Sequence, residues 1–466
     1  MLSYLRILVV VVSITLAMAI AGCGSSNMAG ISPPPGLTGN TVVSLLLSSS
    51  ANDHLSQFNF NFSSISLTSK SGNTVTLLAG PQNAEFVHLN GNIEPLVTVN
   101  VPQDIYVSAS ATVASSTFVC IDLNSTGGLQ TNTSGSGSLP TNSVTINLPS
   151  PLTIAGAHMG LVLDMLVAQS LSYPSCDTLV QGPVSVTPTF TLTPLAFAAQ
   201  PTNSGNGLAN DLEGVLSLVN PTAGSFQLTA PDGLTWSLHT SGGTRFQGVS
   251  DFSGLGSGMP VSLDAAIQPD GSLLATRVPV PDISTASLTT VSGPLLFVAS
   301  SQPALLAYYD FGSATFTISG QLSNLQSLPF PATFTGVNMV PGQRIYLTTH
   351  APNFPNGPNY IPAATVTLLP QTLNGTVTAV SNDGGFTTYG ITLASYDHFS
   401  SLAVQAGQTS LLQNPANVLI YADSSVQMLN STPLAVGNTL RFSGLVFNDN
   451  GILKMDCAQI ADGVAQ

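Results

Sequence analysis

The stretch FNFNFSSISL, residues 58–67, alternates between apolar and polar side chains over its first half. In an extended chain its three phenylalanines fall on one face and its two asparagines on the other. Short runs rich in Val, Thr, Ile and Phe recur along the rest of the chain, separated by 42 glycines and 32 prolines. Such runs are typical of β-strands joined by turns. The sequence therefore predicts an all-β protein.

The chain carries unusually little charge for its length. Charged residues make up 6% of its 466 positions, against roughly 25% in ordinary soluble proteins. Lys and Glu, the usual solvent-facing residues of surface helices, are nearly absent. The formal net charge is -14, and no cluster of Lys and Arg occurs. Because nucleic acids and anionic lipid surfaces are bound through such clusters, we expect no nucleic-acid partner.

The first residues have the features of an export signal. Residues 1–22 contain one basic side chain and then an apolar run that is short for a membrane span and ends in small residues. Ile20, Ala21 and Gly22 directly precede Cys23. This motif resembles the lipobox of bacterial lipoproteins. The resemblance implies cleavage before Cys23 and attachment of lipid to that cysteine.

A lipid anchor would set the location of the protein. Two or more acyl chains hold a protein stably, at about 0.8 kcal/mol per buried methylene, whereas one chain binds only marginally. Gly24 follows the cysteine where some lipoproteins have Asp, and by resemblance this implies sorting to the outer membrane. Residues 23–40, rich in Gly, Ser and Pro, predict a flexible tether after the lipidated cysteine. We therefore expect a bacterial envelope protein, facing either the periplasm or the exterior. An ordinary secretory signal with a chance cysteine is the alternative.

Residues 41–198 are predicted to form a β-sandwich, because short strands recur there at close spacing. Residues 160–171 have the apolar content of a helix, but we expect a strand because their neighbours are strands. The expected strands are 41–48, 58–67, 75–78, 86–89, 97–101, 105–121, 144–148, 159–168 and 184–192.

This region resembles domain of unknown function 4382, which occurs in bacterial lipoproteins. The likeness rests on four segments and covers about a third of the chain. They are VVSLLLSSS (42–50), FNFNFSSISLTSKSGNTVTLL (58–78), PLTIAGAHMGLVLDMLVAQSL (151–171) and VTPTFTLTPLAF (186–197). The resemblance implies no catalytic residue.

A linker at 199–211 precedes three repeats, which are predicted at 212–283, 288–370 and 371–462. Each repeat opens with Gly-x-Φ-x-x-Val, where Φ is apolar, and later carries Gly-x-x-Φ-x-Φ. The first motif begins at Gly214, Gly293 and Gly375, and the second at Gly258, Gly342 and Gly437. A unit of about 80 residues can close into a small β-barrel, which removes its edge strands. The repeats resemble domain of unknown function 5666, a small β-barrel module of exported bacterial proteins.

The four cysteines are Cys23, Cys120, Cys176 and Cys457. If Cys23 carries lipid, three are left. Cys120 and Cys176 fall in the same predicted domain in an oxidising compartment, so they form either a disulfide or two buried thiols. Cys457 occupies the place of an alanine in the other repeats, and we expect it to pack as a small apolar residue.

The sequence shows no catalytic motif. Its six histidines lack metal-ligand spacing, and HExxH, Gly-x-Ser-x-Gly, P-loop and GxGxxG motifs are missing. Asp397 and His398 are adjacent, but neighbours on a strand face opposite ways. Asp211 and Glu213 share a face and are the only candidate carboxylate pair that we consider. We therefore predict no catalytic residues, no metal and no cofactor, and expect that the protein is not an enzyme.

Exposed aromatic side chains are the remaining candidates for ligand contact. Trp236 shares a strand face with Leu238, so we expect it in a core. The candidate ligand-facing aromatics are Tyr308, Tyr309, Phe354 and Tyr360.

Three hypotheses about function are consistent with the sequence. The first is a non-catalytic envelope lipoprotein of binding, adhesive or structural type, with an envelope protein or a glycan as partner. The second is a glycan-binding accessory lipoprotein that uses the loop aromatics. The third is an envelope hydrolase with a site between domains. The missing catalytic motifs favour the first.

Overall fold

The computed structural model describes residues 37–50, 55–89, 92–123, 129–171, 184–202, 204–230, 232–280, 288–298, 304–308, 315–319, 325–327, 340, 342–350, 360–368, 370–394, 397, 399–404, 412–428, 430 and 432–462. Regular structure in these ranges is β-strand, apart from the short helices α2 (Val167–Ser170) and α4 (Phe399–Val404) and two 3-10 turns. The predicted all-β class is confirmed.

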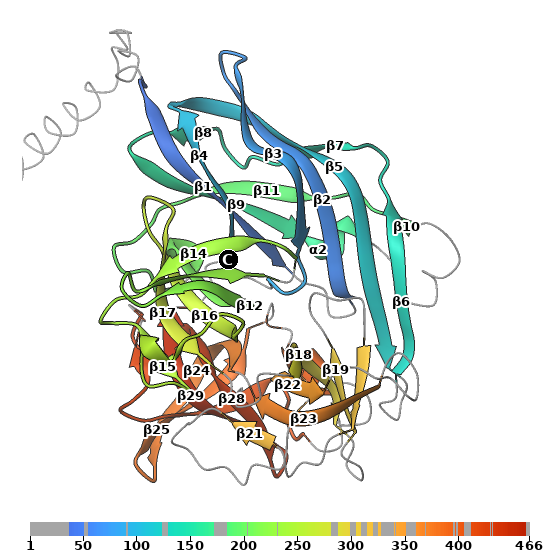
Figure 1. Ribbon diagram of the computed structural model, residues 1–466, viewed down its shortest axis with the longest axis vertical. Helices are drawn as coiled ribbons and strands as arrows, with labels where there is room; N and C mark the ends of the chain where they lie inside the picture. The colour runs from blue at the N-terminus through green and yellow to red at the C-terminus, as the bar shows by residue number, and fades with distance from the viewer. Residues whose placement is uncertain are drawn as a thin grey trace, which may run out of the picture. The chain divides into compact units, whose positions relative to one another are not determined.

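The N-terminal region contains two sheets that enclose one core (Figure 1). The first has the order β11 (Phe190–Leu195), β9 (His158–Leu166), β1 (Asn40–Ser50), β4 (Glu94–Pro102). The second has the order β10 (Val184–Ser185), β6 (Leu129–Ser138), β5 (Asp104–Leu123), β2 (Leu55–Ser69), β3 (Thr74–Glu85), and β7 (Ser143–Ile146) and β8 (Leu152–Ile154) also pair with β5. This arrangement confirms the predicted sandwich.

The alternation in FNFNF places its phenylalanines in the sandwich core. Phe58, Phe60 and Phe62 are fully buried on one face of β2. The ring of Phe60 makes edge contacts with Phe86 and Phe190, at centroid distances of 5.9 and 6.0 Å. Because Phe190 belongs to the other sheet, these contacts join the two layers. Fully burying such a ring is worth roughly 1.5–3 kcal/mol.

Several strands in this region differ from those expected: the strand expected at 75–78 continues to Glu85, and β6 and β8 were not expected. Residues 86–89, expected as a strand, form a turn because the Glu85 carboxylate accepts the N–H groups of Val87 and His88. The strand expected to reach residue 168 ends at Leu166, and one helical turn follows. The strand expected at 184–192 is divided between β10 and β11.

The rest of the chain contains three sheets of identical strand order. The first comprises β12 (Leu208–Asn220), β13 (Ser225–Thr229), β14 (Thr235–His239), β15 (Arg245–Gln247), β16 (Pro260–Ile267) and β17 (Leu273–Pro279). The second comprises β18 (Leu288–Val298), β19 (Ala304–Tyr308), β20 (Thr315–Ser319), β21 (Leu325–Ser327), β22 (Arg344–His350) and β23 (Tyr360–Leu368). The third comprises β24 (Gln371–Asp383), β25 (Phe386–Leu393), β26 (Asn417–Ala422), β27 (Gln427–Met428), β28 (Thr439–Asp449) and β29 (Ile452–Asp462).

Each of these sheets closes on itself. The third and sixth strands of a repeat pair in parallel, as β14–β17, β20–β23 and β26–β29. Closure through this pair makes a five-stranded ring, with the short fourth strand added outside it. The predicted barrel-like repeats are therefore confirmed. The first strand, β12, begins at Leu208, so the last four residues of the expected linker already belong to a barrel.

The two glycine motifs have separate structural roles. A Cβ on Gly214 would lie 2.4 Å from Thr229 O, and one on Gly375 would lie 3.0 Å from Thr392 O. These glycines allow the first and second strands of a barrel to approach closely. The second-motif glycines have φ of +90° at Gly258, +90° at Gly342 and +93° at Gly437, in the turn that leads into the fifth strand. Left-handed backbone of this kind favours glycine.

We expect Gly214→Ala to lower the free energy of unfolding by about 1–3 kcal/mol, because the added methyl group overlaps the neighbouring strand's backbone. Urea denaturation followed by the fluorescence of Trp236, the single tryptophan, reports on the same barrel. Gly242→Ala is the matched control, since nothing lies within 4 Å of its added Cβ. Equal midpoints for the two variants would contradict the close-approach explanation.

Candidate functional site

Two rows of polar side chains cross the second sandwich sheet on the face opposite the phenylalanine core. Strand register places one row over β5, β2 and β3 as Thr117, Asn59 and Glu85, and the other as Ser115, Asn61 and Asn83. Asn59 Nδ2 donates to Thr117 Oγ1 at 3.4 Å, and Asn61 Nδ2 donates to Asn83 Oδ1 at 2.7 Å. The amides are therefore oriented across the strands by their neighbours.

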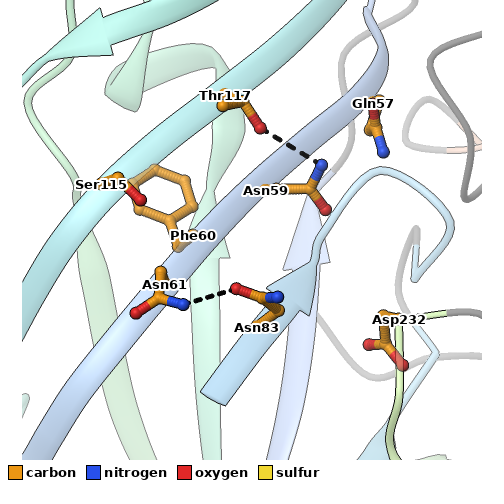
Figure 2. Close-up of a pocket in the computed structure, with 8 residues that line it drawn as sticks. All are labelled: Gln57, Asn59, Phe60, Asn61, Asn83, Ser115, Thr117 and Asp232. Atoms are coloured by element: carbon orange, nitrogen blue, oxygen red, sulfur yellow. Dashed lines mark hydrogen bonds between the residues drawn. The ribbon is translucent and has the colours of Figure 1, made fainter. Parts of the chain in front are cut away.

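These rows form one side of a pocket of about 310 Å³. Figure 2 shows Asn59 and Asn61 on β2, Asn83 on β3, and Asp232 on a separate segment at the pocket's other side. The lining residues are Gln57, Asn59, Phe60, Asn61, Asn83, Ser115, Thr117 and Asp232. All but Phe60 carry a polar side chain, so the pocket is a hydrogen-bonding surface.

Glu85 ends one row and links it to a buried charged cluster. Its carboxylate is only 1% exposed. Oε1 accepts the N–H groups of Phe58 and Val87 at 2.7 and 3.0 Å, and Oε2 accepts the N–H of His88 at 3.0 Å. Because a buried carboxylate needs such donors, one side chain fixes the start of the β2 alternation and the turn after β3.

His88 bridges two buried glutamates. Its Nδ1 lies 2.8 Å from Glu85 Oε2 and its Nε2 lies 2.8 Å from Glu94 Oε2. Burial disfavours the imidazolium, but the charge of Glu94 and the hydrogen bonds to both carboxylates outweigh it and raise the pKa of His88 well above its ordinary value. Each ring nitrogen faces an acceptor, so the protonated form satisfies both contacts. Both nitrogens are thereby occupied, which leaves neither to serve as a general base.

Asp232 belongs to both the pocket and this cluster. Burial, followed by the negative charge of Glu94, raises the pKa of Asp232 to about 6. Its Oδ1 accepts the Leu234 N–H at 3.0 Å. Its Oδ2 and Glu94 Oε1 are buried without a hydrogen-bond partner among the described residues. Of these two residues, Asp232 lines the pocket, so a carboxylate with one unpaired oxygen forms part of its wall.

The turn that carries Asp232 is held against the sandwich. Trp236 Nε1 donates to Pro95 O at 2.8 Å, and Trp236 is 7% exposed. Its core cluster contains barrel residues together with Leu46, Ile93 and Leu195 from the sandwich. The prediction that Trp236 packs in a core is confirmed. The same packing positions Asp232 beside the amide rows.

Most of the site residues expected from the sequence fall outside the described part of the chain. Those outside it are Ile20, Ala21, Gly22, Cys23, Cys176, Tyr309 and Phe354. Cys120, Tyr308 and Tyr360 lie in β5, β19 and β23, but their side chains are not among those described. The disulfide and the ligand-facing aromatics therefore stay predictions.

Cys457 behaves as the repeat alignment predicts. It is 1% exposed in the core of the third repeat, and Ala275 is equally buried in the first. Burial raises the pKa of the Cys457 thiol to about 12. Its expected role as a small apolar core residue is confirmed.

The carboxylates considered for catalysis have structural contacts. Asp211 Oδ1 lies 3.8 Å from Arg277 Nη2, and Asp211 Oδ2 accepts the hydroxyl of Thr372 at 2.7 Å. Asp397 accepts the N–H groups of Asn374 and Phe399, which ties β24 to the start of α4. Asp211 therefore joins the first and third repeats, and Asp397 holds β24 to the start of α4.

The described ranges contain neither a metal-binding cluster nor a membrane-spanning helix. No group of three or more His, Cys, Asp or Glu side chains there is placed to hold a metal ion. No helix within those ranges has the length and apolar content needed to cross a membrane.

Comparison with known proteins adds no family. The chain matches no protein family, and no curated protein matches it. Among solved structures it is similar to a deletion mutant of the single-stranded DNA binding protein from Thermus aquaticus, with 13% identity, 56% of this chain and 97% of that chain covered, and a TM-score of 0.14. It is also similar to a glycoside hydrolase family 32 protein from Bifidobacterium adolescentis, with 10% identity, 90% and 67% covered, and a TM-score of 0.15. TM-scores this low do not establish a shared fold.

The buried cluster predicts a pH-dependent stability. Asp232 has a folded pKa near 6, above its ordinary value of 3.8, so the native state holds its proton more tightly than the unfolded chain does. That contribution is present at low pH and is lost as pH rises from about 4 to above 6. His88, whose pKa is also raised, adds stability that is full below pH 6.5 and is lost as pH rises through the folded value.

As pH rises from 4 to 7, the wild type should lose about 2 kcal/mol of unfolding free energy that Asp232→Asn keeps, because the variant has no proton to release at this position. Urea denaturation across that range measures the difference. Asp270→Asn is the control of opposite sign, because hydrogen bonds from Ser272 lower the pKa of Asp270. Parallel stability curves for the wild type and Asp232→Asn would contradict a proton held at Asp232.

Proposed function

We propose that the protein is an exported, lipid-anchored bacterial envelope protein that binds a ligand without transforming it. The motif from Ile20 to Cys23 at the end of a signal-like segment carries the proposal. The polar pocket between the β2 rows and Asp232 is the ligand site. Adhesive and structural roles of the barrel repeats are compatible with the same anchor.

The contacts of Asp211, the carboxylate that the sequence offers for hydrolysis, and of His88 support a binding role. Glycoside hydrolysis uses two carboxyl groups facing one bond, one of them with a raised pKa. Asp211 is instead engaged with Arg277 and Thr372. His88 is held between Glu85 and Glu94 through both ring nitrogens. These groups are committed to the fold, while the amides of the pocket have capacity for a ligand.

We expect Cys23→Ser to move the protein from the membrane fraction to the soluble fraction of the envelope. Without a thiol at this position there is no sulfur to receive a diacylglyceryl group, and stable anchoring needs the acyl chains. Fractionation of cells followed by immunoblotting measures the shift.

Cys457→Ser is the matched control, since that cysteine is buried in a barrel core and has no part in anchoring. It is expected to stay in the membrane fraction. If Cys23→Ser remains membrane-bound with its leader removed, the lipid-anchor proposal is wrong.

A further inference from the structure

We propose that the pocket formed by the β5–β2–β3 amide rows and Asp232 binds a short segment of a neutral glycan through its hydroxyl groups. This rests on the proposed binding function and adds the ligand class and the residues that contact it. The pocket is lined by sandwich residues together with Asp232, which lies between β13 and β14 of the first barrel.

The donor and acceptor pattern of the pocket matches sugar hydroxyls. An asparagine side chain offers two N–H donors and a carbonyl acceptor, and a hydroxyl group both donates and accepts. Asn59 and Asn61 each commit one N–H to a neighbouring strand, through Thr117 and Asn83. Their amide oxygens and second N–H groups make no hydrogen bond within the part of the chain that the structure describes. A polyhydroxylated ligand can pair with both kinds of group.

The charge of the described residues around the pocket disfavours anionic ligands. None of the described residues that line it is Lys, Arg or His, and Asp232 contributes a carboxylate. Glu85 and Glu94 contribute two more carboxylates near Asp232, and among the described residues the cation that contacts them is His88. Phosphate, sulfate and uronate groups would meet net negative charge without a donor cation. Neutral hydroxyls can instead donate to the carboxylates.

The unpaired carboxylate oxygens point to a hydroxyl donor in particular. Glu94 is 3% exposed, and its Oε1 has no hydrogen-bond partner among the described residues. Asp232 Oδ2 is also buried without a hydrogen-bond partner among the described residues. Leaving a buried acceptor without a hydrogen bond is unfavourable. A ligand hydroxyl that donates to Asp232 recovers part of that cost.

The dimensions fit one or two sugar rings. Adjacent strands lie about 4.8 Å apart, so a row over three strands spans roughly 10 Å. The volume of about 310 Å³ is at the small end of ligand sites, which begin at about 300 Å³. A longer chain would extend along the exposed rows while one unit reaches Asp232.

Binding should also depend on pH. The groups that face Asp232 are Glu94, His88 and Glu85. Because burial and Glu94 raise the pKa of Asp232 to about 6, the carboxylate that accepts a hydroxyl becomes fully charged only above that pH. We expect affinity for a neutral glycan to rise by several fold between pH 5 and pH 7.5. Asp232→Asn should remove this dependence.

Isothermal titration of the detergent-solubilised full chain with neutral tetrasaccharides of glucose, xylose, mannose and N-acetylglucosamine tests the proposal. We expect saturable binding of at least one of them with a dissociation constant between 10 µM and 1 mM, the range of about 4–7 kcal/mol that a few hydrogen bonds supply. Asn59→Ala and Asn61→Ala should each weaken it at least five-fold. Asn100→Ala, an exposed amide on β4 of the other sheet, is the matched control and should bind as the wild type does.

Three outcomes overturn the inference. They are no binding of any tetrasaccharide, binding that Asn61→Ala leaves unchanged, and saturable binding of a neutral Ser- and Asn-rich peptide with no saccharide bound. Circular dichroism of each variant excludes loss of fold as the cause of a weaker signal. The proposed anchoring is tested separately by the Cys23→Ser fractionation, so a failure of glycan binding and a failure of the envelope proposal give different results.

Discussion

Arg277→Met is expected to lower the free energy of unfolding by about 3–5 kcal/mol, the usual cost of removing one partner from a buried ion pair. Arg277 is 2% exposed, and its Nε donates to Asp264 Oδ2 at 2.7 Å. Burial opposes its charge, but the carboxylates of Asp264 and Asp211 outweigh burial and raise the pKa of Arg277. Without the guanidinium, Asp264 is left buried without a counter-charge, with the Asp211 N–H still donating to its Oδ1.

The loss extends beyond one barrel. Arg277 Nη2 also donates to Ser443 Oγ of the third repeat at 3.3 Å, and Thr372 donates from that repeat to Asp211. Arg277→Met therefore removes contacts that join the first and third repeats. Urea denaturation followed by Trp236 fluorescence measures the change in the first repeat.

Arg245→Met is the matched control. Arg245 lies in the same repeat, and its hydrogen bond to Ser425 O is exposed to solvent. Exposed contacts of this kind are worth about 0–1 kcal/mol. A loss in Arg277→Met no larger than that in Arg245→Met would show that the buried network does not stabilise the repeats.

Glu85→Ala is expected to cost about 3–5 kcal/mol of stability, because three N–H groups lose their acceptor and His88 loses one of its two carboxylates. The affected groups lie in β2 and in the turn after β3. Differential scanning calorimetry should show a lower unfolding temperature for the sandwich. The pocket should lose its shape too, since Glu85 ends one of its rows.

Glu85→Gln is the conservative comparison. Its amide oxygen can keep the acceptor role toward Phe58 and Val87, while the charge that pairs with His88 is gone. We expect it to lose less than Glu85→Ala. Equal losses in the two variants would mean that the charge alone matters and that the backbone contacts do not.

Local patterns in the sequence predict the fold well. The FNFNF alternation places three phenylalanines in the core because side chains on a strand alternate between faces. The repeat glycines mark two places, a close approach of strands and a left-handed turn. Both favour glycine, because it has no Cβ. The expected strand at 86–89 is wrong because the Glu85 side chain takes up the N–H groups that a strand would present to a neighbour.

The candidate site is harder to predict because its parts come from distant segments. Asp232 joins the amide rows only when the first barrel packs against the sandwich, and the tie between Trp236 and Pro95 crosses 141 positions. One signal was present: Glu85, Glu94 and Glu213 are the only glutamates in a chain with 6% charge. All three are buried. In a chain with so little charge, each glutamate is a candidate for a buried structural or functional group.

The central claim, that the chain is a lipid-anchored envelope protein, is tested most directly by mass spectrometry of the N-terminal peptide from membrane-purified protein. The predicted peptide begins at Cys23 and carries a diacylglyceryl group on the sulfur and an acyl chain on the amino group. A peptide that still includes Gly22, or one that begins at Cys23 with a free thiol, would contradict the claim.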